Sequence, residues 1–163
     1  MAVSLQDANL VWQKVKIATM NANPAAQNAF AELKKWLAQQ KGNPQLQYFD
    51  VNAADIDTGA DGKVILSGAG KLYGAYFKRV ADVDTTHSFI EVLDDATDNS
   101  APTTDIVATL RLAGVSNEEA FVVYPKGADL AVGIVVSATT TAGGTTESAA
   151  TESANGFLIV GAA

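Results

Sequence analysis

The sequence contains no cysteine and a single histidine, His87. The lack of cysteine excludes disulfide bonds, thiolate nucleophiles and cysteine-ligated zinc. A lone histidine excludes sites that need several imidazole ligands, and we interpret His87 as a surface or sheet-edge residue. No segment approaches the ~18 apolar residues of a membrane-spanning helix, and the N-terminus lacks the basic and apolar regions of a signal peptide. We therefore expect no membrane partner and synthesis in a cytoplasm.

Basic residues are also few. The 163 residues include 11 Lys and Arg against 18 Asp and Glu, which gives a net charge of -7. Proteins that bind nucleic acid concentrate positive charge to displace counterions from phosphates, whereas the adjacent basic pairs here are only Lys34-Lys35 and Lys78-Arg79. We expect these pairs to be solvated surface, and we expect no nucleic-acid partner. The length fits one domain, or one small domain with an arm.

The usual signatures of catalytic and ligand sites are missing. There is no nucleophile elbow and no P-loop, and the glycines at 68–70 lack the third glycine of a dinucleotide fingerprint. Asp55, Asp57 and Asp61 are spaced as in a calcium loop, but the required glycine and final glutamate are absent, so we predict a turn. We interpret 94–102 as a solvated acidic loop. The sequence predicts no enzymatic activity, no cofactor and no metal site.

The first 22 residues carry two competing patterns. Val11, Val15 and Ala18 have helical spacing, whereas an alternation over the same residues fits a strand. Large apolar groups such as Trp12 have no evident partner nearby. Two interpretations stay open, namely an arm that docks on another subunit and a short helix that packs on its own domain.

Residues 24–40 have the clearest helical pattern. Asn23 is a favourable N-cap, and Pro24 suits the first helical position. One apolar stripe with helical spacing, flanked by Trp36, is made of Ala26, Ala29, Phe30, Leu33 and Leu37. The stripe fits a helix that packs on its own sheet and equally a helix that bundles with copies of itself.

The rest of the chain alternates with the period of β-strands. We take 72–93 as a central hairpin of two strands with a polar connector, and we predict further strands at 47–51, 63–66, 105–112, 120–124, 130–137 and 156–160. Pro125 is expected to end the strand before it, and Gly133 to mark a bulge or a close backbone approach. The stretch 138–154, rich in Thr, Ser, Ala and Gly, is expected to be a flexible excursion.

Strands with no helical segments between them predict a mainly β fold. We expect an antiparallel β-sandwich, or a barrel-like variant, as the C-terminal domain. The predicted organisation is an N-terminal arm and amphipathic helix for assembly or anchoring, residues 1–45, followed by the sandwich, residues 46–163, with the flexible loop at about 138–154.

Residues from about 63 to 163 resemble a known module. The stretches that carry the resemblance are KLYGAYFKRV at 71–80, SFIEVLDDAT at 88–97, TDIVATLRL at 104–112, FVVYPKGADLAVGIVVSATTT at 121–141 and GFLIV at 156–160. Their most telling positions are Pro125, Gly127, Gly133, Ile134 and Val136. Together they resemble a small β-sandwich module of structural proteins in tailed bacteriophages, which include head decoration (cement) proteins and some fibre subunits.

The resemblance implies a non-enzymatic virion protein that binds the outside of a capsid and stabilises it. Its expected partners are the major capsid protein and copies of itself, as a homo-oligomer with a trimer favoured, acting through many simultaneous contacts. Its expected location is the capsid surface, after assembly in the host cytoplasm. The alternatives are a fibre, neck or tail-appendage subunit, an enzyme accessory domain, and a carbohydrate-binding sandwich that stacks sugars on Tyr73 or Tyr76.

The candidate contact residues lie in the N-terminal part. Trp12 and Trp36 are the expected anchors, because buried tryptophan often dominates interfaces, although packing within the chain is the competing interpretation for both. The predicted interface consists of Leu10, Val11, Trp12, Val15, Phe30, Leu33, Trp36 and Leu37. Deleting the residues through Asn23 is expected to abolish particle binding while the sandwich still folds.

Overall fold

The computed structural model describes residues 8–17, 23–39, 46–52, 63–79, 88–95, 105–112, 118–139 and 154–163. These ranges contain two helices and eight strands. In chain order they are α1 (Ala8–Ile17), α2 (Pro24–Ala38), β1 (Leu46–Val51), β2 (Lys63–Ser67), β3 (Gly70–Arg79), β4 (Ser88–Leu93), β5 (Ile106–Leu112), β6 (Glu119–Leu130), β7 (Gly133–Thr139) and β8 (Ala154–Ala162).

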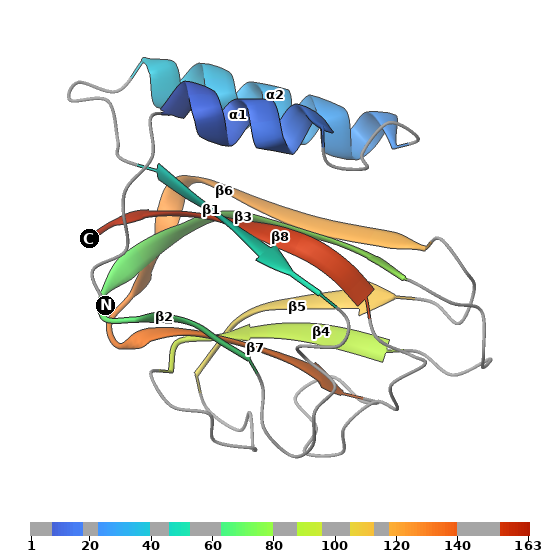
Figure 1. Ribbon diagram of the computed structural model, residues 1–163, viewed down its shortest axis with the longest axis vertical. Coiled ribbons are helices and arrows are strands. Elements are labelled where there is room, and N and C mark those ends of the chain that lie inside the picture. The colour runs from blue at the N-terminus through green and yellow to red at the C-terminus, as the bar shows by residue number, and fades with distance from the viewer. Residues whose placement is uncertain are drawn as a thin grey trace.

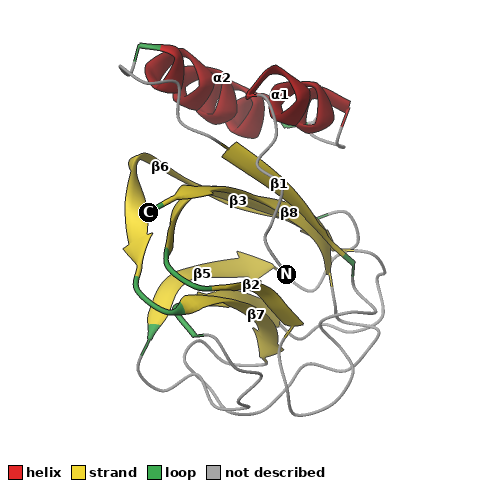
Figure 2. Ribbon diagram, turned by 60° about the vertical axis from the view of Figure 1, so that its left-hand side comes forward, coloured by secondary structure: helices red, strands yellow, loops and turns green. Residues whose placement is uncertain are grey.

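The strands form two four-stranded sheets. The first sheet has the order β1-β8-β3-β6, and the second sheet has the order β2-β7-β4-β5. All neighbouring strands are antiparallel. The sheets lie face to face and the two helices cover the outer face of the first sheet, so the molecule has three layers (Figures 1 and 2). The predicted antiparallel sandwich is confirmed, and the sheets stay separate instead of closing into a barrel.

The predicted central hairpin at 72–93 is wrong. β3 pairs with β6 and β8 in the first sheet, whereas β4 pairs with β5 and β7 in the second. The chain therefore crosses from one sheet to the other between these two strands. Alternation correctly located both strands, but it carries no information about which strand each one pairs with.

β3 is buried on both faces, which explains its almost continuous apolar character. Leu72, Ala75 and Phe77 belong to the core between the sheets, whereas Tyr73 and Tyr76 belong to the core under the helices. Leu72 and Ala75 face the same way despite their spacing because the register shifts between Leu72 and Gly74. Such a bulge inserts one extra residue into the alternation.

β6 also differs from the sequence prediction. Pro125 does not end a strand, because β6 continues from Glu119 to Leu130. β6 is an edge strand with β3 as its paired neighbour, and a proline there interrupts no central ladder. The turn comes later, at residues 131–132, so Gly133 begins β7 instead of marking a bulge inside a strand.

The Asp94 side chain stabilises the turn between β6 and β7. Its carboxylate accepts hydrogen bonds from the backbone N–H groups of Ala131 (2.8 Å), Val132 (2.9 Å) and Gly133 (3.2 Å). Partial burial raises the pKa of the Asp94 carboxyl, but these three hydrogen bonds outweigh that effect and hold the pKa below its usual value. The prediction of a merely solvated acidic loop is therefore wrong at Asp94.

α2 begins as the sequence predicts. The Asn23 side chain accepts a hydrogen bond of 3.1 Å from the Ala26 N–H, and Pro24 occupies the first turn. The apolar stripe faces the first sheet, with Ala26, Phe30, Leu33 and Leu37 buried. α1 is a helix that packs over β1, which is the second of the two interpretations left open for the first 22 residues.

Several predictions concern segments outside the described residues. These are the turn at 55–62, the His87 environment, the remainder of the acidic loop at 96–102 and most of the excursion at 138–154. Of that last stretch, Ala138 and Thr139 belong to β7 and Ala154 belongs to β8.

Candidate functional site

The predicted contact residues are mostly core residues of the protein itself. Val11, Trp12 and Val15 of α1 are between 0% and 8% exposed, and Phe30, Leu33 and Leu37 of α2 are between 1% and 3% exposed. Trp36 is half-buried at the margin of the same cluster. Leu10 lies in α1, with its side chain outside the described part. Six of the eight residues thus offer almost no surface to another molecule in this arrangement.

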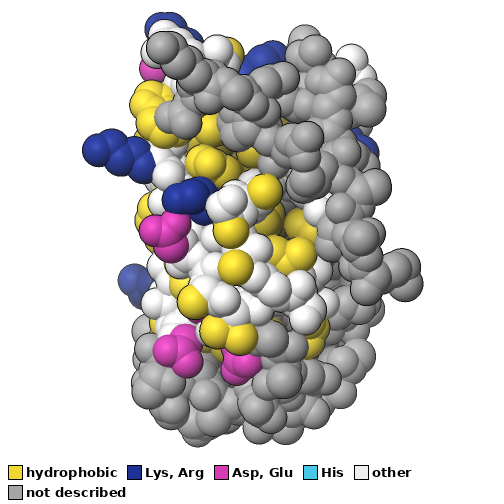
Figure 3. Space-filling view, turned by 90° about the vertical axis from the view of Figure 1, so that its left-hand side faces the viewer, with side chains coloured by type: hydrophobic (Ala, Val, Ile, Leu, Met, Phe, Trp, Pro, Cys, Tyr) yellow, Lys and Arg dark blue, Asp and Glu magenta, His cyan; other side chains and the backbone are white. Residues whose placement is uncertain are grey.

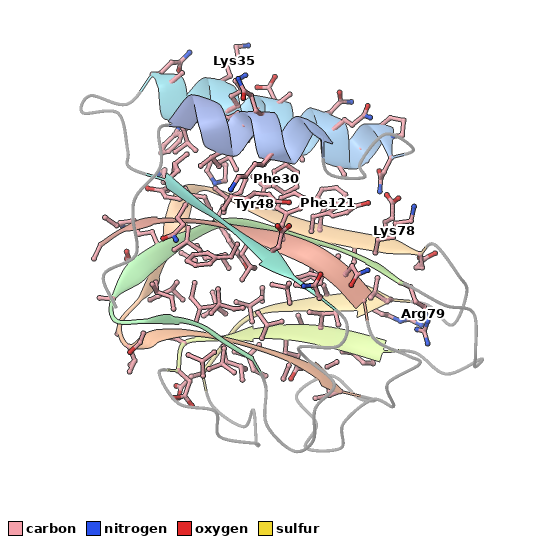
Figure 4. All side chains as sticks on the ribbon, in the orientation of Figure 1. Phe30, Lys35, Tyr48, Lys78, Arg79 and Phe121 are labelled. Atoms are coloured by element: carbon pink, nitrogen blue, oxygen red, sulfur yellow. The ribbon has the colours of Figure 1, made fainter. Side chains whose placement is uncertain are left out.

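Aromatic side chains join the helix layer to the first sheet. The Phe157 ring of β8 lies at the centre, 5.4 Å from Phe30, 5.1 Å from Tyr48 and 5.5 Å from Tyr76 between ring centroids. Phe30 also contacts Phe121 of β6 at 6.4 Å. Figure 4 shows Phe30, Tyr48 and Phe121 between the helices and the sheet. The N-terminal helices are therefore part of one packed body with the sandwich.

Gly74 of β3 creates the space that Phe30 fills. A Cβ atom at Gly74 would lie 2.7 Å from Cε1 and 3.2 Å from Cζ of the Phe30 ring. Side chains in closely packed cores cannot absorb such an overlap without displacement. The position of α2 over the sheet therefore depends on this small residue.

The outer face of the helix layer is polar. The exposed residues there include Gln13 of α1 and Gln27, Glu32, Lys34 and Lys35 of α2. Lys35 points away from the molecule in Figure 4. The predicted solvation of Lys34-Lys35 is confirmed, whereas Lys78 is half-buried and Arg79 is 1% exposed, so the same prediction is wrong for the second pair.

The two tyrosines proposed to stack on sugars are not accessible. Tyr73 is 6% exposed and Tyr76 is 1% exposed, and both lie in the core under the helices. Stacking on a sugar requires an open ring face, which neither side chain has. The carbohydrate-binding alternative loses the residues on which it depended.

Two charged side chains, Arg79 and Glu91, are buried in the fold. Arg79 ends β3, and Glu91 in the middle of β4 is 0% exposed. Each takes part in an interaction with other groups of the protein, as buried charges generally must. Among the described residues, no three His, Cys, Asp or Glu side chains gather closely enough to hold a metal ion.

One end of the molecule carries the most exposed large apolar residue of the described chain, Val132, at 48%. It lies at the β6–β7 turn that Asp94 holds, and its carbonyl accepts a hydrogen bond of 2.8 Å from the Gly68 N–H. Figure 3 shows the side of the molecule that lies on the left in Figure 1, where the hydrophobic atoms of the described residues are interrupted by backbone and by charged side chains. The described residues on this face therefore present their apolar atoms in scattered groups.

The four edge strands differ in how readily another strand could pair with them. β2 is short and its register with β7 shifts between Val64 and Leu66, while β6 contains Pro125 and a shift against β3. β5 has a residue of β6 in contact with it, because the Tyr124 hydroxyl of β6 donates a hydrogen bond of 2.9 Å to the Val107 carbonyl of β5. β1 alone of the four pairs without a shift along its whole length.

No protein-family model, no curated protein and no solved structure matches this chain. No helix within the described ranges combines the length and apolar character needed to cross a membrane.

Proposed function

We propose that the protein is a non-enzymatic virion component that binds the outside of a tailed-phage capsid and stabilises it as a decoration, or cement, protein. Residues 63–163, which carry the resemblance to that class, contribute seven of the eight strands of the two-sheet sandwich. This agreement between the resembling stretch and the folded sandwich is the observation that carries the proposal.

The packing gives the proposal a physical basis. A cement protein needs a rigid body with contact surfaces and does not need a pocket. Two cores, one between the sheets and one under the helices, share the strands of the first sheet and make such a body. Affinity for a capsid can then come from many weak contacts repeated over a lattice.

The location of these contacts changes from the sequence prediction. The stripe of α2 and the apolar residues of α1 are used inside the protein. The major capsid protein must therefore be met by exposed surfaces of the folded body. The acidic net charge of -7 favours a capsid partner whose outer surface is basic.

Co-sedimentation tests the proposal directly. Capsids of a phage lacking this chain are mixed with increasing amounts of the purified protein and pelleted. We expect binding that saturates at a fixed ratio to the shell protein, together with greater resistance of the shells to heat. An unrelated acidic β-sandwich protein of similar size is the control. Protein that stays in the supernatant at every concentration would refute the proposal.

A further inference from the structure

Within the described residues, the edge of β1 carries few of the devices that usually prevent strands from pairing with other molecules, and its one charged side chain is the exposed Asp50. β1 pairs with β8 over six consecutive residue pairs, from Leu46 with Gly161 to Val51 with Gly156. Its other side has no partner strand among the described residues. Natural sheets usually protect such an edge with a bulge, a proline or a lysine, and LQYFDV contains none of these.

A second copy of the same strand fits this edge. Leu46 and Tyr48 face the helices, whereas Phe49 and Val51 face the space between the sheets. Directly opposed residues of an antiparallel pair lie on the same face. A two-fold symmetric pair must therefore be centred on one residue, so that like faces meet.

Centring the pair on Phe49 gives favourable neighbours. Phe49 then lies opposite the partner's Phe49, and Tyr48 lies opposite the partner's Asp50. Aromatic pairs stabilise neighbouring strands, whereas the Tyr48 hydroxyl already interacts with the Asp50 carboxylate of its own chain. Centring on Tyr48 would instead place the buried Leu46 opposite the partner's Asp50, which would desolvate a carboxylate against an apolar side chain.

Charge supports the same register. The Lys14 ammonium group of α1 lies 5.6 Å from the centroid of the Tyr48 ring. In the pair centred on Phe49, the partner's Asp50 lies opposite that ring, with its Cβ about 4.5–5.5 Å from that of Tyr48. Lys14 and Asp50 are both exposed in the single chain. The symmetric pair therefore brings together two sets of opposite charges, one on each side of the axis.

We propose that two copies of this protein associate through their β1 strands, in antiparallel register centred on Phe49, and so join their first sheets into one continuous sheet. An interface in which each subunit uses the same surface closes at two subunits. The pair thus replaces the trimer that the resemblance implies, and it does not depend on whether the protein decorates a capsid.

Charge reversal with sedimentation velocity tests this pair in the purified full chain. We expect the wild-type protein to shift from the mass of one chain to that of two as its concentration rises from micromolar to near millimolar. Lys14→Glu and Asp50→Lys should each weaken the pair roughly tenfold, because each places like charges across the axis. The double variant Lys14→Glu with Asp50→Lys should recover pairing.

Lys35→Glu is the matched control, because it changes the net charge as Lys14→Glu does but lies on the outer face of α2 (Figure 4). It should leave the dissociation constant unchanged. Hydrogen exchange should show β1 amides becoming protected as the dimer forms. A single-chain mass at all concentrations would overturn the proposal. A mass of three chains, a double variant that stays dissociated, or equal effects of Lys35→Glu and Lys14→Glu would do so as well.

Discussion

The contact between Phe30 of α2 and Gly74 of β3 makes a sharp prediction for a double-mutant cycle. Gly74→Ala places a methyl group 2.7 Å from the Phe30 ring. Overpacking of this kind costs about 1–3 kcal/mol, against a gain of about 0.5–1 kcal/mol from replacing glycine in a strand. Phe30→Ala removes a ring that is 2% exposed and should cost about 3–5 kcal/mol.

The two substitutions should not be additive. Once Phe30 is alanine, the space above Gly74 is empty, so Gly74→Ala should become neutral or stabilising in that background. We expect a coupling free energy of about 1–3 kcal/mol, because residues in contact share the same volume. The free energy of unfolding is measured by guanidinium titration, followed by circular dichroism and tryptophan fluorescence.

Glu32→Ala is the control for this cycle. The residue is exposed on the same helix, so its effect should stay within about 0.5 kcal/mol. If the effects of Gly74→Ala and Phe30→Ala add within about 0.5 kcal/mol, the ring does not lie over Gly74. The docking of α2 on the first sheet would then be refuted.

Three further predictions concern other parts of the fold. Asp94→Ala should cost about 1–3 kcal/mol at neutral pH. Because the folded pKa of Asp94 is lowered, this difference from wild type should begin to shrink as pH falls below about 4 and should be lost as pH falls through the folded pKa. Denaturation at several pH values measures the difference, and an unchanged difference in acid would contradict the prediction. Gly156→Ala should prevent normal folding by circular dichroism, because its Cβ would overlap the Tyr76 carbonyl oxygen, and a native-like variant would contradict the β3–β8 packing. Deleting residues 1–23 should lower the denaturation midpoint by removing the buried Val11, and an unchanged midpoint would restore the interpretation of a detachable arm.

Local patterns in the sequence located most elements. The cap at Asn23 and the stripe through Phe30 and Leu37 predicted α2 correctly. Alternation located the strands and predicted the sandwich, because each strand has at least one buried face. These features depend on residues within a few positions of one another, which a single sequence displays directly.

The errors arose where distant segments meet. β3 and β4 are neighbours in sequence but lie in different sheets, and no local pattern encodes that choice. Asp94 binds backbone groups 37 to 39 residues away, so its role is invisible in the acidic stretch that contains it. Pro125 was expected to end its strand, as proline often does, but an edge strand tolerates a proline.

The apolar stripe of α2 shows a related ambiguity of local patterns. A helix with one apolar stripe fits a sheet of its own chain and the surface of another subunit equally well. The cluster around Phe157 decides between them by supplying intrachain partners for Phe30 and Tyr48. The open edge of β1 became visible only when the four edge strands could be compared.

The abundance of this chain in intact particles tests the proposed function most directly. Particles are purified from the source that encodes the chain, and the chain is quantified against the major shell protein by mass spectrometry. A decoration protein should be present in a copy number comparable with that of the shell protein. A few copies per particle would indicate a neck, tail or fibre subunit instead, and absence from the particle would contradict a virion role altogether.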